Sequence, residues 1–343
     1  MYCPKCGKEN PDDAQLCQSC GYVLTQSTVT AESVNVKTSG LAIASMVLGI
    51  LSVLTCGITA IPAVILGIIS LVQIEKSGGR LTGRVFAIVG IAVPVVVCFL
   101  GIGLLIPALN GAREQGKRAV CLNNLRQLTL AWIVYADEND DKLVNGAAGS
   151  SRVGELHWVG KDWHDDYKSG EQLPEDQQIS EIKKGALWPY CKNVKLYHCP
   201  AGFQGDIRTY SIVDSMNGVP RPRTKEDHVW VKRRMQIPSR DKRMVFLDVG
   251  RAAPDSFAVY YDKEQWWDPP PIRHGKGTNV SFADGHSEYW KWKGKETIKL
   301  GKTADRTRPL SNIIPQSPES KEDLHRLQKA VWGKLGYTPG ASD

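Results

Sequence analysis

The sequence predicts an α+β fold in which a long helix follows a strongly hydrophobic segment and packs on an antiparallel sheet. From Arg84 to Leu109 the chain reads RVFAIVGIAVPVVVCFLGIGLLIPAL, and beyond Gly111 apolar residues recur at helical spacing. This stripe consists of Cys121, Leu125, Leu128, Trp132 and Tyr135. Steps of four, three, four and three residues place these side chains on one helix face, which a folded domain can bury. Farther on, apolar and polar residues alternate on both sides of an Asp-Gly pair, a pattern typical of paired strands.

Composition narrows the class of protein. A chain of 343 residues has room for a hydrophobic block and one folded domain of ordinary size. The formal net charge of +7 comes from Lys and Arg residues that are scattered rather than gathered in one basic block. The sequence therefore gives no support for nucleic-acid binding.

Residues 1–22 contain the strongest local motif, CPKC followed after ten residues by CQSC. Each pair is followed by Gly, so each can form a tight turn whose backbone N–H groups lie near the thiolates. The four sulfur ligands are Cys3, Cys6, Cys17 and Cys20. They predict a structural Zn²⁺ site, a zinc ribbon, in preference to two disulfides or a redox pair, and they indicate a reducing compartment.

A hydrophobic block follows a Thr- and Ser-rich linker at 23–39. Residues 41–72 carry no charge, and as one helix they would measure roughly 48 Å, against about 30 Å for a bilayer core. Cys56-Gly57 and Pro62 suggest a break that gives two short segments. The sequence thus predicts a transmembrane block at 40–109, with spans at about 41–56, 59–74 and 85–109. One long tilted span over 41–72 stays an alternative.

The charges beside these segments set the expected topology. Lys76, Arg80 and Arg84 lie between the second and third spans, and the positive-inside rule places them in the cytoplasm. Three crossings then give a multi-pass protein of the bacterial inner (cytoplasmic) membrane, with a cytoplasmic ribbon and an extracytoplasmic C-terminal domain. The tilted-span alternative leaves two crossings. The expected partner is the lipid bilayer, and the Gly- and Ala-rich spans permit self-association.

Two parts of the chain resemble known families. The ribbon followed by GLAIASMVLGILSVL and GGRLTGRVFAIVGI resembles a small bacterial multi-span membrane domain of unknown function. Residues 84–292 resemble the prepilin-type, processing-associated H-x(9)-D-G family, which is similar to the pseudopilins of type II secretion. The match rests on Ala112-Arg113, Arg118, Cys121, Asn124 to Gln127, Tyr135 to Asp137, and His274 followed nine residues later by Asp284-Gly285. This resemblance implies a pilin-like domain at 110–300 whose stem helix, at about 110–137, packs on an antiparallel sheet.

One departure from that family bears on function. A prepilin carries a basic leader, a Gly at the cleavage site and a Glu early in the mature span, and residues 85–109 contain no Glu. We therefore expect no processing by prepilin peptidase. The predicted function is a membrane-anchored, pseudopilin-like structural or interaction protein that presents an extracytoplasmic α+β domain to an envelope or secretion-related partner. We expect no enzyme activity, since GxSxG, HExxH and P-loop patterns are missing from the sequence.

The C-terminal signature permits a structural and a functional interpretation. Asp284-Gly285 suits a two-residue hairpin turn, and His274 then precedes the first strand. The alternative is a metal-dependent enzyme or ligand-binding envelope sensor with a site near His274 and Asp284. Its candidate ligands are Asp248, His274, Asp284 and His286, because imidazoles and carboxylates bind metals.

Three cysteines lie in the predicted domain, Cys121, Cys191 and Cys199. A disulfide between Cys121 and Cys199 would join two family-like segments, and three buried free thiols are the equal alternative. The acidic run from Asp137 to Asp141 permits Ca²⁺ but lacks the Gly and final Glu of an EF-hand loop, so a solvated helix end is favoured.

The remaining features concern packing. Eight tryptophans between residues 158 and 292 favour core packing over a sugar-binding surface. WWDPPP at 266–271 predicts an exposed, rigid loop where a partner docks. The tail at 301–343 contains Ser317-Pro318, an expected helix start, and Leu324, Leu327 and Val331 mark a helix at about 318–335.

Overall fold

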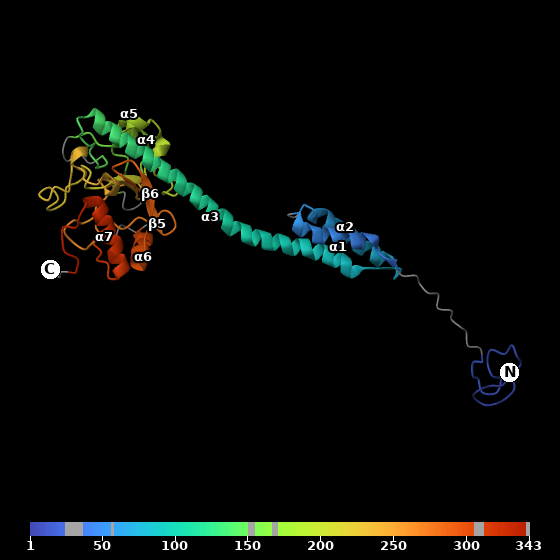
Figure 1. The fold of residues 1–343 in the computed structure, drawn as a ribbon. Helices are drawn as coiled ribbons and strands as arrows, with labels where there is room; N and C mark the ends of the chain where they lie inside the picture. The colour runs from blue at the N-terminus through green and yellow to red at the C-terminus, as the bar shows by residue number, and fades with distance from the viewer. Residues whose placement is uncertain (25–36, 56–57, 150–154, 167–170, 305–311, 341–343) are drawn as a thin grey trace. The chain divides into compact units, whose positions relative to one another are not determined.

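The computed structural model of the chain describes residues 1–24, 37–55, 58–149, 155–166, 171–304 and 312–340. The chain divides into two compact units, residues 1–107 and 108–343 (Figure 1). Most of the predicted linker, and the Cys56-Gly57 pair expected to break the hydrophobic run, lie outside the described residues.

The first unit contains the cysteine-rich N-terminus and a group of helices. The hydrophobic run forms two helices, α1 (Gly40–Leu54) and α2 (Ala60–Lys76), and the long helix α3 (Arg84–Glu138) begins in this unit. Two short strands, β1 (Lys37–Thr38) and β2 (Leu81–Thr82), pair in parallel beside them.

Small residues let these helices approach closely. A Cβ added to Gly49 would come 2.8 Å from the backbone oxygen of Gly90, so a larger residue does not fit there without a backbone shift. Ser45 donates a hydrogen bond of 2.8 Å to the carbonyl oxygen of Ala63, which joins α1 to α2. The Gly and Ser residues of this block therefore let its helices pack closely within the unit.

The prediction of an α+β membrane protein is wrong in its membrane part. Helices α1 and α2 have 15 and 17 residues, fewer than the roughly 20 that a bilayer core requires. Across the described parts of the chain, α3 included, no helix combines enough length with enough apolar character to span a membrane. This finding also contradicts the predicted location as a multi-pass protein of the inner membrane, with its cytoplasmic ribbon and extracytoplasmic domain.

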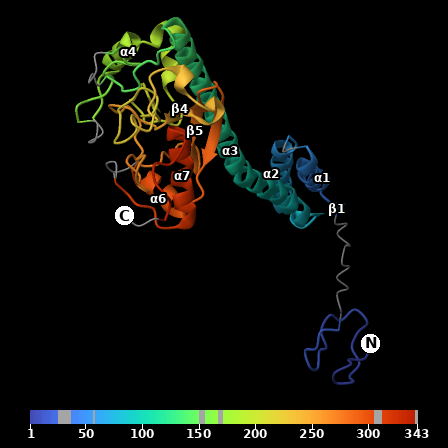
Figure 2. The same cartoon turned by 60° about the vertical axis from the view of Figure 1, so that its left-hand side comes forward.

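The second unit is built on a four-stranded antiparallel sheet. In spatial order the strands are β3 (Tyr210–Ile212), β4 (Met244–Asp248), β5 (Gly277–Phe282) and β6 (Ser287–Lys291). The other helices of this unit are α4 (Glu175–Lys184), α5 (Trp188–Cys191), α6 (Lys295–Ala304) and α7 (Pro318–Trp332). Short 3-10 turns occupy Val194–Tyr197, Arg234–Gln236 and Arg240–Lys242. The C-terminal part of α3 runs beside the sheet in every view (Figures 1 and 2).

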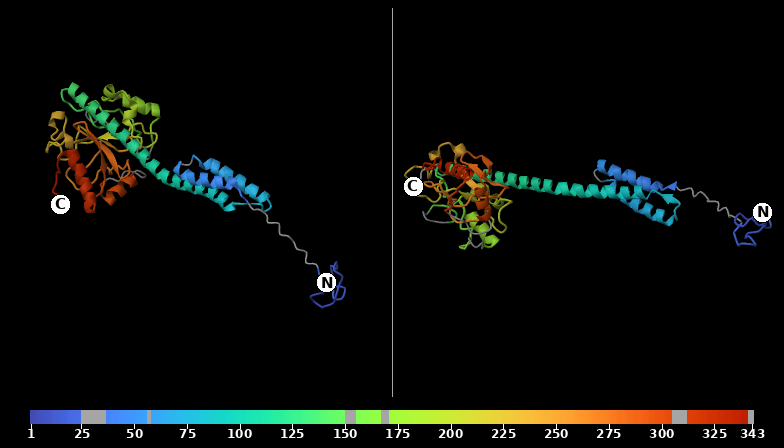
Figure 3. Two further views of the ribbon diagram at one scale, coloured as in Figure 1. Left: turned by 45° about the vertical axis from the view of Figure 1, so that its right-hand side comes forward. Right: turned by 90° about the horizontal axis from the view of Figure 1, so that it is seen from below.

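Alternate residues of β5 and β6 face α3. Ser281 accepts a hydrogen bond of 2.7 Å from Thr129, and Ser287 donates one of 2.9 Å to the backbone of Leu122. Because neighbouring strand residues point to opposite faces, the residues between them form the other side of the sheet. There the guanidinium of Arg326 on α7 lies 3.8 Å from the ring centroid of Trp290. The sheet is thus covered by α3 on one face and by α7 on the other (Figure 3).

The predicted stripe forms the contact between α3 and the sheet. Cys121, Leu125, Leu128 and Trp132 are fully buried, and Tyr135 is partly buried. The helix ends at Glu138, and Asp140 and Asp141 follow with positive φ angles that turn the chain away. Six of the eight tryptophans between residues 158 and 292 lie in the core or pack against it, as predicted. Trp158, Trp266, Trp290 and Trp292 are buried in it.

Two details differ from the predictions. The WWDPPP segment is not an exposed loop, because Trp266, Pro270 and Pro271 are buried and Trp266 packs edge-on against Trp292. Helix α7 begins at Pro318 as predicted but ends at Trp332, where Gly333 with a φ of 84° terminates it.

We predict that Trp132→Ala lowers the free energy of unfolding of the second unit by about 3–5 kcal/mol, because it empties space between α3 and the sheet. The matched control is Leu130→Ala on the same helix, whose side chain is 46% exposed. It should cost only about 0.5 kcal/mol. Urea unfolding followed by tryptophan fluorescence measures both, and equal losses would contradict the proposed packing.

Candidate metal centres

The N-terminal cysteines lie on two turns of matching geometry. In the first turn Gly7 donates to the Cys3 carbonyl at 2.8 Å, and in the second Gly21 donates to the Cys17 carbonyl at 2.8 Å. Gly7 and Gly21 have φ angles of 70° and 67°, a conformation that glycine adopts without strain. Each Cys-x-x-Cys-Gly sequence therefore folds locally into one half of the site.

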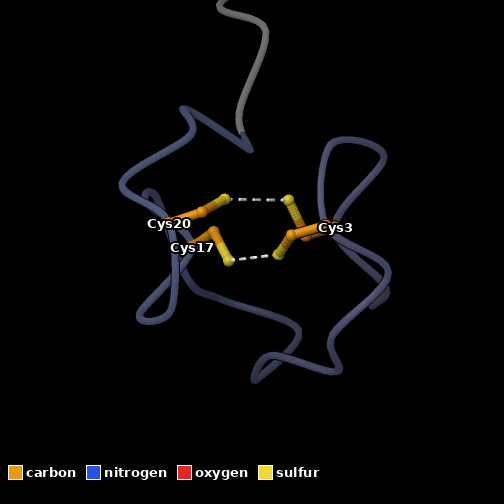
Figure 4. A group of neighbouring side chains, drawn as sticks. Cys3, Cys17 and Cys20 are labelled. Carbon is orange, nitrogen blue, oxygen red and sulfur yellow. Dashed lines mark hydrogen bonds between the residues drawn. The ribbon is translucent and has the colours of Figure 1, made fainter.

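The four sulfur atoms have the spacing of a tetrahedral zinc site. Cys3 Sγ lies 3.7 Å from Cys20 Sγ, and Cys6 Sγ lies 3.6 Å from Cys17 Sγ (Figure 4). Zinc bonds of about 2.3 Å in tetrahedral geometry separate two sulfurs by about 3.8 Å. The pair distances and the all-thiolate donor set therefore fit Zn²⁺, and the four cysteines form a structural zinc site. Because the thiolates fill the coordination sphere, the ion holds the turns together and has no open position for catalysis.

Neighbouring groups support the thiolate form of Cys17. Asn10 donates from its side chain to Cys17 Sγ at 3.5 Å and accepts from the backbone of Gln18 at 3.0 Å, so it links the two turns. The backbone N–H of Ser19 is the main cause that lowers the pKa of Cys17 to about 6. Zinc binds the deprotonated thiol, and these contacts reduce the cost of deprotonation.

A second cluster of ligand-type side chains lies inside the second unit. It consists of Cys121 on α3, Cys199 after the 3-10 turn, Asp248 at the end of β4, and His274 before β5. One donor atom from each lies within 4.8 Å of the others, and all four residues are buried. Cys121 Sγ is 3.3 Å from Asp248 Oδ2, and Cys199 Sγ is 3.3 Å from His274 Nε2.

His274 is held from both sides of its ring. Its Nε2 lies 3.6 Å from Asp248 Oδ2, and its Nδ1 lies 2.8 Å from Glu114 Oε1 on α3. Burial disfavours the charged ring, but hydrogen bonds with Asp248 and Cys199 outweigh it and raise the pKa of His274 to about 10. Burial also raises the pKa of Cys121 well above its usual value. The cluster thus concentrates ionisable groups where water is scarce.

The structure divides the four candidate ligands of the C-terminal signature into two pairs. Asp248 and His274 belong to the buried cluster, whereas Asp284 and His286 contact each other at 2.6 Å in an exposed turn. The six residues of β5, about 20 Å of extended chain, separate His274 from that turn. The sequence did not predict that Cys121 and Cys199 join Asp248 and His274 in one site. These four residues lie in separate segments, and no local spacing pattern connects them.

Two further predictions concern the three cysteines of the second unit and the acidic run at 137–141. Cys121, Cys191 and Cys199 are free thiols rather than members of a disulfide. In the acidic run, Asp137 pairs with Arg234 at 2.5 Å, and Asp141 accepts from the backbone of Met235 at 2.7 Å. Neither of the two ligand groups found among the described residues includes this run. Asp137 and Asp141 both pair with Arg234.

Comparison with known proteins identifies two segments. Residues 2–24 match the zinc-ribbon domain, and residues 41–105 match a domain of unknown function (DUF4190). These matches confirm the predicted ribbon and the predicted domain of unknown function behind it, while no match to the H-x(9)-D-G family is found. No curated protein and no solved structure matches the chain.

We predict that Cys17→Ser lowers the zinc content of the purified full-length protein by one ion per chain. Since the metal supplies the folding energy of so short a segment, residues 2–24 should also become sensitive to protease. Cys98→Ser is the matched control, because Cys98 is an exposed thiol outside both ligand groups. Elemental analysis measures the zinc, and an unchanged content in Cys17→Ser would contradict the assignment.

Proposed function

We propose that the chain is a non-enzymatic structural or interaction protein of the pseudopilin-like kind. The support is the resemblance of residues 84–292 to the H-x(9)-D-G family, together with a long helix that buries one apolar face against a four-stranded antiparallel sheet. The zinc ribbon contributes a second, separately folded module. In this account both modules serve binding, and neither carries out a reaction.

The observation that carries the proposal is that both ends of the H-x(9)-D-G signature contact α3. At one end, His274 Nδ1 meets Glu114 at 2.8 Å. At the other, a Cβ added to Gly285 would lie 3.5 Å from Leu130 and 3.6 Å from Ile133. Gly285 has a φ of 99°, which other residues rarely adopt. The signature therefore fixes β5 along the helix, which is a structural task.

The alternative function is an enzyme or sensor with one site near His274 and Asp284. Such a site needs its ligands to converge in a cleft. His274 is 2% exposed and lies at one end of β5, whereas Asp284 lies in the exposed turn at the other end. The separation of these residues favours the structural role.

The outward face of α3 is the surface that we propose for the interaction. Val120 and Val134 are 49% and 42% exposed, and Leu130, which borders the turn at Gly285, is 46% exposed. Apolar residues placed there contribute little to the core. A second copy of α3, as in pilin-like assemblies, would cover them.

We predict that the full-length protein, cross-linked in its own cells with a short lysine-reactive reagent, gives a discrete species larger than the monomer. Val134→Glu should reduce this species several-fold by placing a charge in the contact. Ile314→Glu is the matched control, since Ile314 is 56% exposed in the same unit and follows Ile313, which pairs with Trp266. Gel mobility and mass spectrometry of the cross-linked band identify its composition.

Two results would contradict the proposal. One is a monomer under all cross-linking conditions. The other is loss of the complex in His286→Ala while Val134→Glu leaves it intact, because that pattern would place function at the Asp284 and His286 pair.

A further inference from the structure

The buried cluster in the second unit has the features of a metal centre that is separate from the zinc ribbon. We propose that Cys121 Sγ, Cys199 Sγ, Asp248 Oδ2 and His274 Nε2 bind a second Zn²⁺ ion, which cross-links α3 to the sheet and to the two loops beside it.

The distances agree with one tetrahedral ion. Bonds of about 2.3 Å to sulfur and about 2.0 Å to nitrogen or oxygen separate the ligand atoms by about 3.3 to 3.8 Å. The Cys121–Asp248 and Cys199–His274 pairs are 3.3 Å apart, and the His274–Asp248 pair is 3.6 Å apart. Three of the six donor pairs thus have the spacing of a tetrahedral ion, and the other three lie within 4.8 Å.

The surroundings of His274 match those of a metal-bound imidazole. A histidine ligand usually donates its second ring N–H to a carboxylate, which fixes the tautomer and orients the free nitrogen toward the metal. Glu114 Oε1 lies 2.8 Å from Nδ1, so Nε2 is the nitrogen left for the ion. Tyr289 donates a hydrogen bond of 2.7 Å to the His274 carbonyl and holds the backbone of this residue in place.

Polar groups around the other ligands support the same assignment. Asp248 Oδ1 is buried with no hydrogen-bond partner, which is costly for a carboxylate unless a positive charge, of an ion or of a protonated His274, lies beside it. The backbone N–H of Ala201 points at Cys199 Sγ over 3.3 Å, as N–H groups do toward metal-bound thiolates. Thr278 donates to the Asp248 carbonyl at 2.8 Å and anchors the end of β4.

The donor set selects the metal and its role. Two thiolates with one imidazole and one carboxylate suit zinc better than the hard cations Mg²⁺ and Ca²⁺. All four ligand residues are buried, and together they fill a tetrahedral shell. The ion would therefore be structural and would leave the proposed non-enzymatic function unchanged.

The test is the zinc content of the purified, reduced, full-length protein equilibrated with zinc alone. Wild type should hold two ions per chain. Cys3→Ser with Cys6→Ser disrupts the ribbon and should retain one, and this variant leaves the buried cluster intact. Cys199→Ser should also retain one. Cys191→Ser is the matched control and should hold two, because Cys191 bonds to Tyr197 and the Leu187 carbonyl outside the cluster.

A second measurement separates a metal site from a cluster of hydrogen-bonded thiols. In the ribbon-disrupted variant, Glu114→Gln should weaken zinc binding at the buried cluster by about 10- to 100-fold. At saturating zinc the cluster should still hold one ion. Cobalt(II) added to the ribbon-disrupted variant should give the absorption bands of a tetrahedral thiolate complex. Titration by competition with a zinc-binding dye measures the affinity.

The proposal is overturned if the ribbon-disrupted variant holds no zinc. It is equally overturned if thiol titration under denaturing, non-reducing conditions shows Cys121 and Cys199 joined as a disulfide in protein that was never reduced and that binds only one ion. If Cys199→Ser fails to fold, the zinc content of the ribbon-disrupted variant still decides whether the proposal holds.

Discussion

The burial of one face of α3 against the four-stranded sheet is the interaction on which the second unit depends. Leu125, Leu128 and Trp132 are fully removed from water on this face. Each such side chain contributes about 1.5–3 kcal/mol on burial. A sheet must bury its hydrophobic face against another element, and α3 provides that cover for this face. The register of α3 against β5 then decides which other groups can meet.

That register explains why polar residues occur in a contact between helix and sheet. Thr129 donates to Ser281 at 2.7 Å, and Asn279 donates from its side chain to the Arg118 carbonyl at 3.1 Å. A slip of the strand by one residue would turn these groups to the opposite face. Cys121 belongs to the same helix face, and the alignment brings it to Asp248, 127 residues away in sequence. The buried cluster is therefore a consequence of the packing that the apolar stripe specifies.

The sequence predicted those features that depend on local patterns. The stripe on α3, the cysteine turns of the ribbon, the β5–β6 hairpin and the start of α7 each follow from residues that are close along the chain. The two-residue turn expected in that hairpin is wrong, because Phe282 and His286 pair across three residues and only Gly285 has a positive φ. The buried cluster could not be predicted in this way, because Cys199 and His274 are 75 residues apart and meet only after the sheet has formed. The membrane prediction failed for a different reason. The expected division of the uncharged run into two segments is found, but the resulting helices have 15 and 17 residues, fewer than a bilayer core requires, and they pack through Gly and Ser.

The two ligand groups differ in how they relate to folding. All four ribbon cysteines lie within residues 3 to 20, so their ion can organise a segment that has no hydrophobic core. The cluster of Cys121, Cys199, Asp248 and His274 is assembled by the fold around it, and an ion there stabilises a structure that packing has already specified. Binding to the folded state alone would raise stability through mass action.

Hydrogen exchange of the full-length protein, followed by mass spectrometry, tests the central claim most directly. If the contact between α3 and the sheet holds the second unit together, amides in 121–136 and in β4 and β5 should be the slowest to exchange and should open in one cooperative step. Exchange of the 121–136 segment well before β4 and β5, in a separate step, would contradict the account.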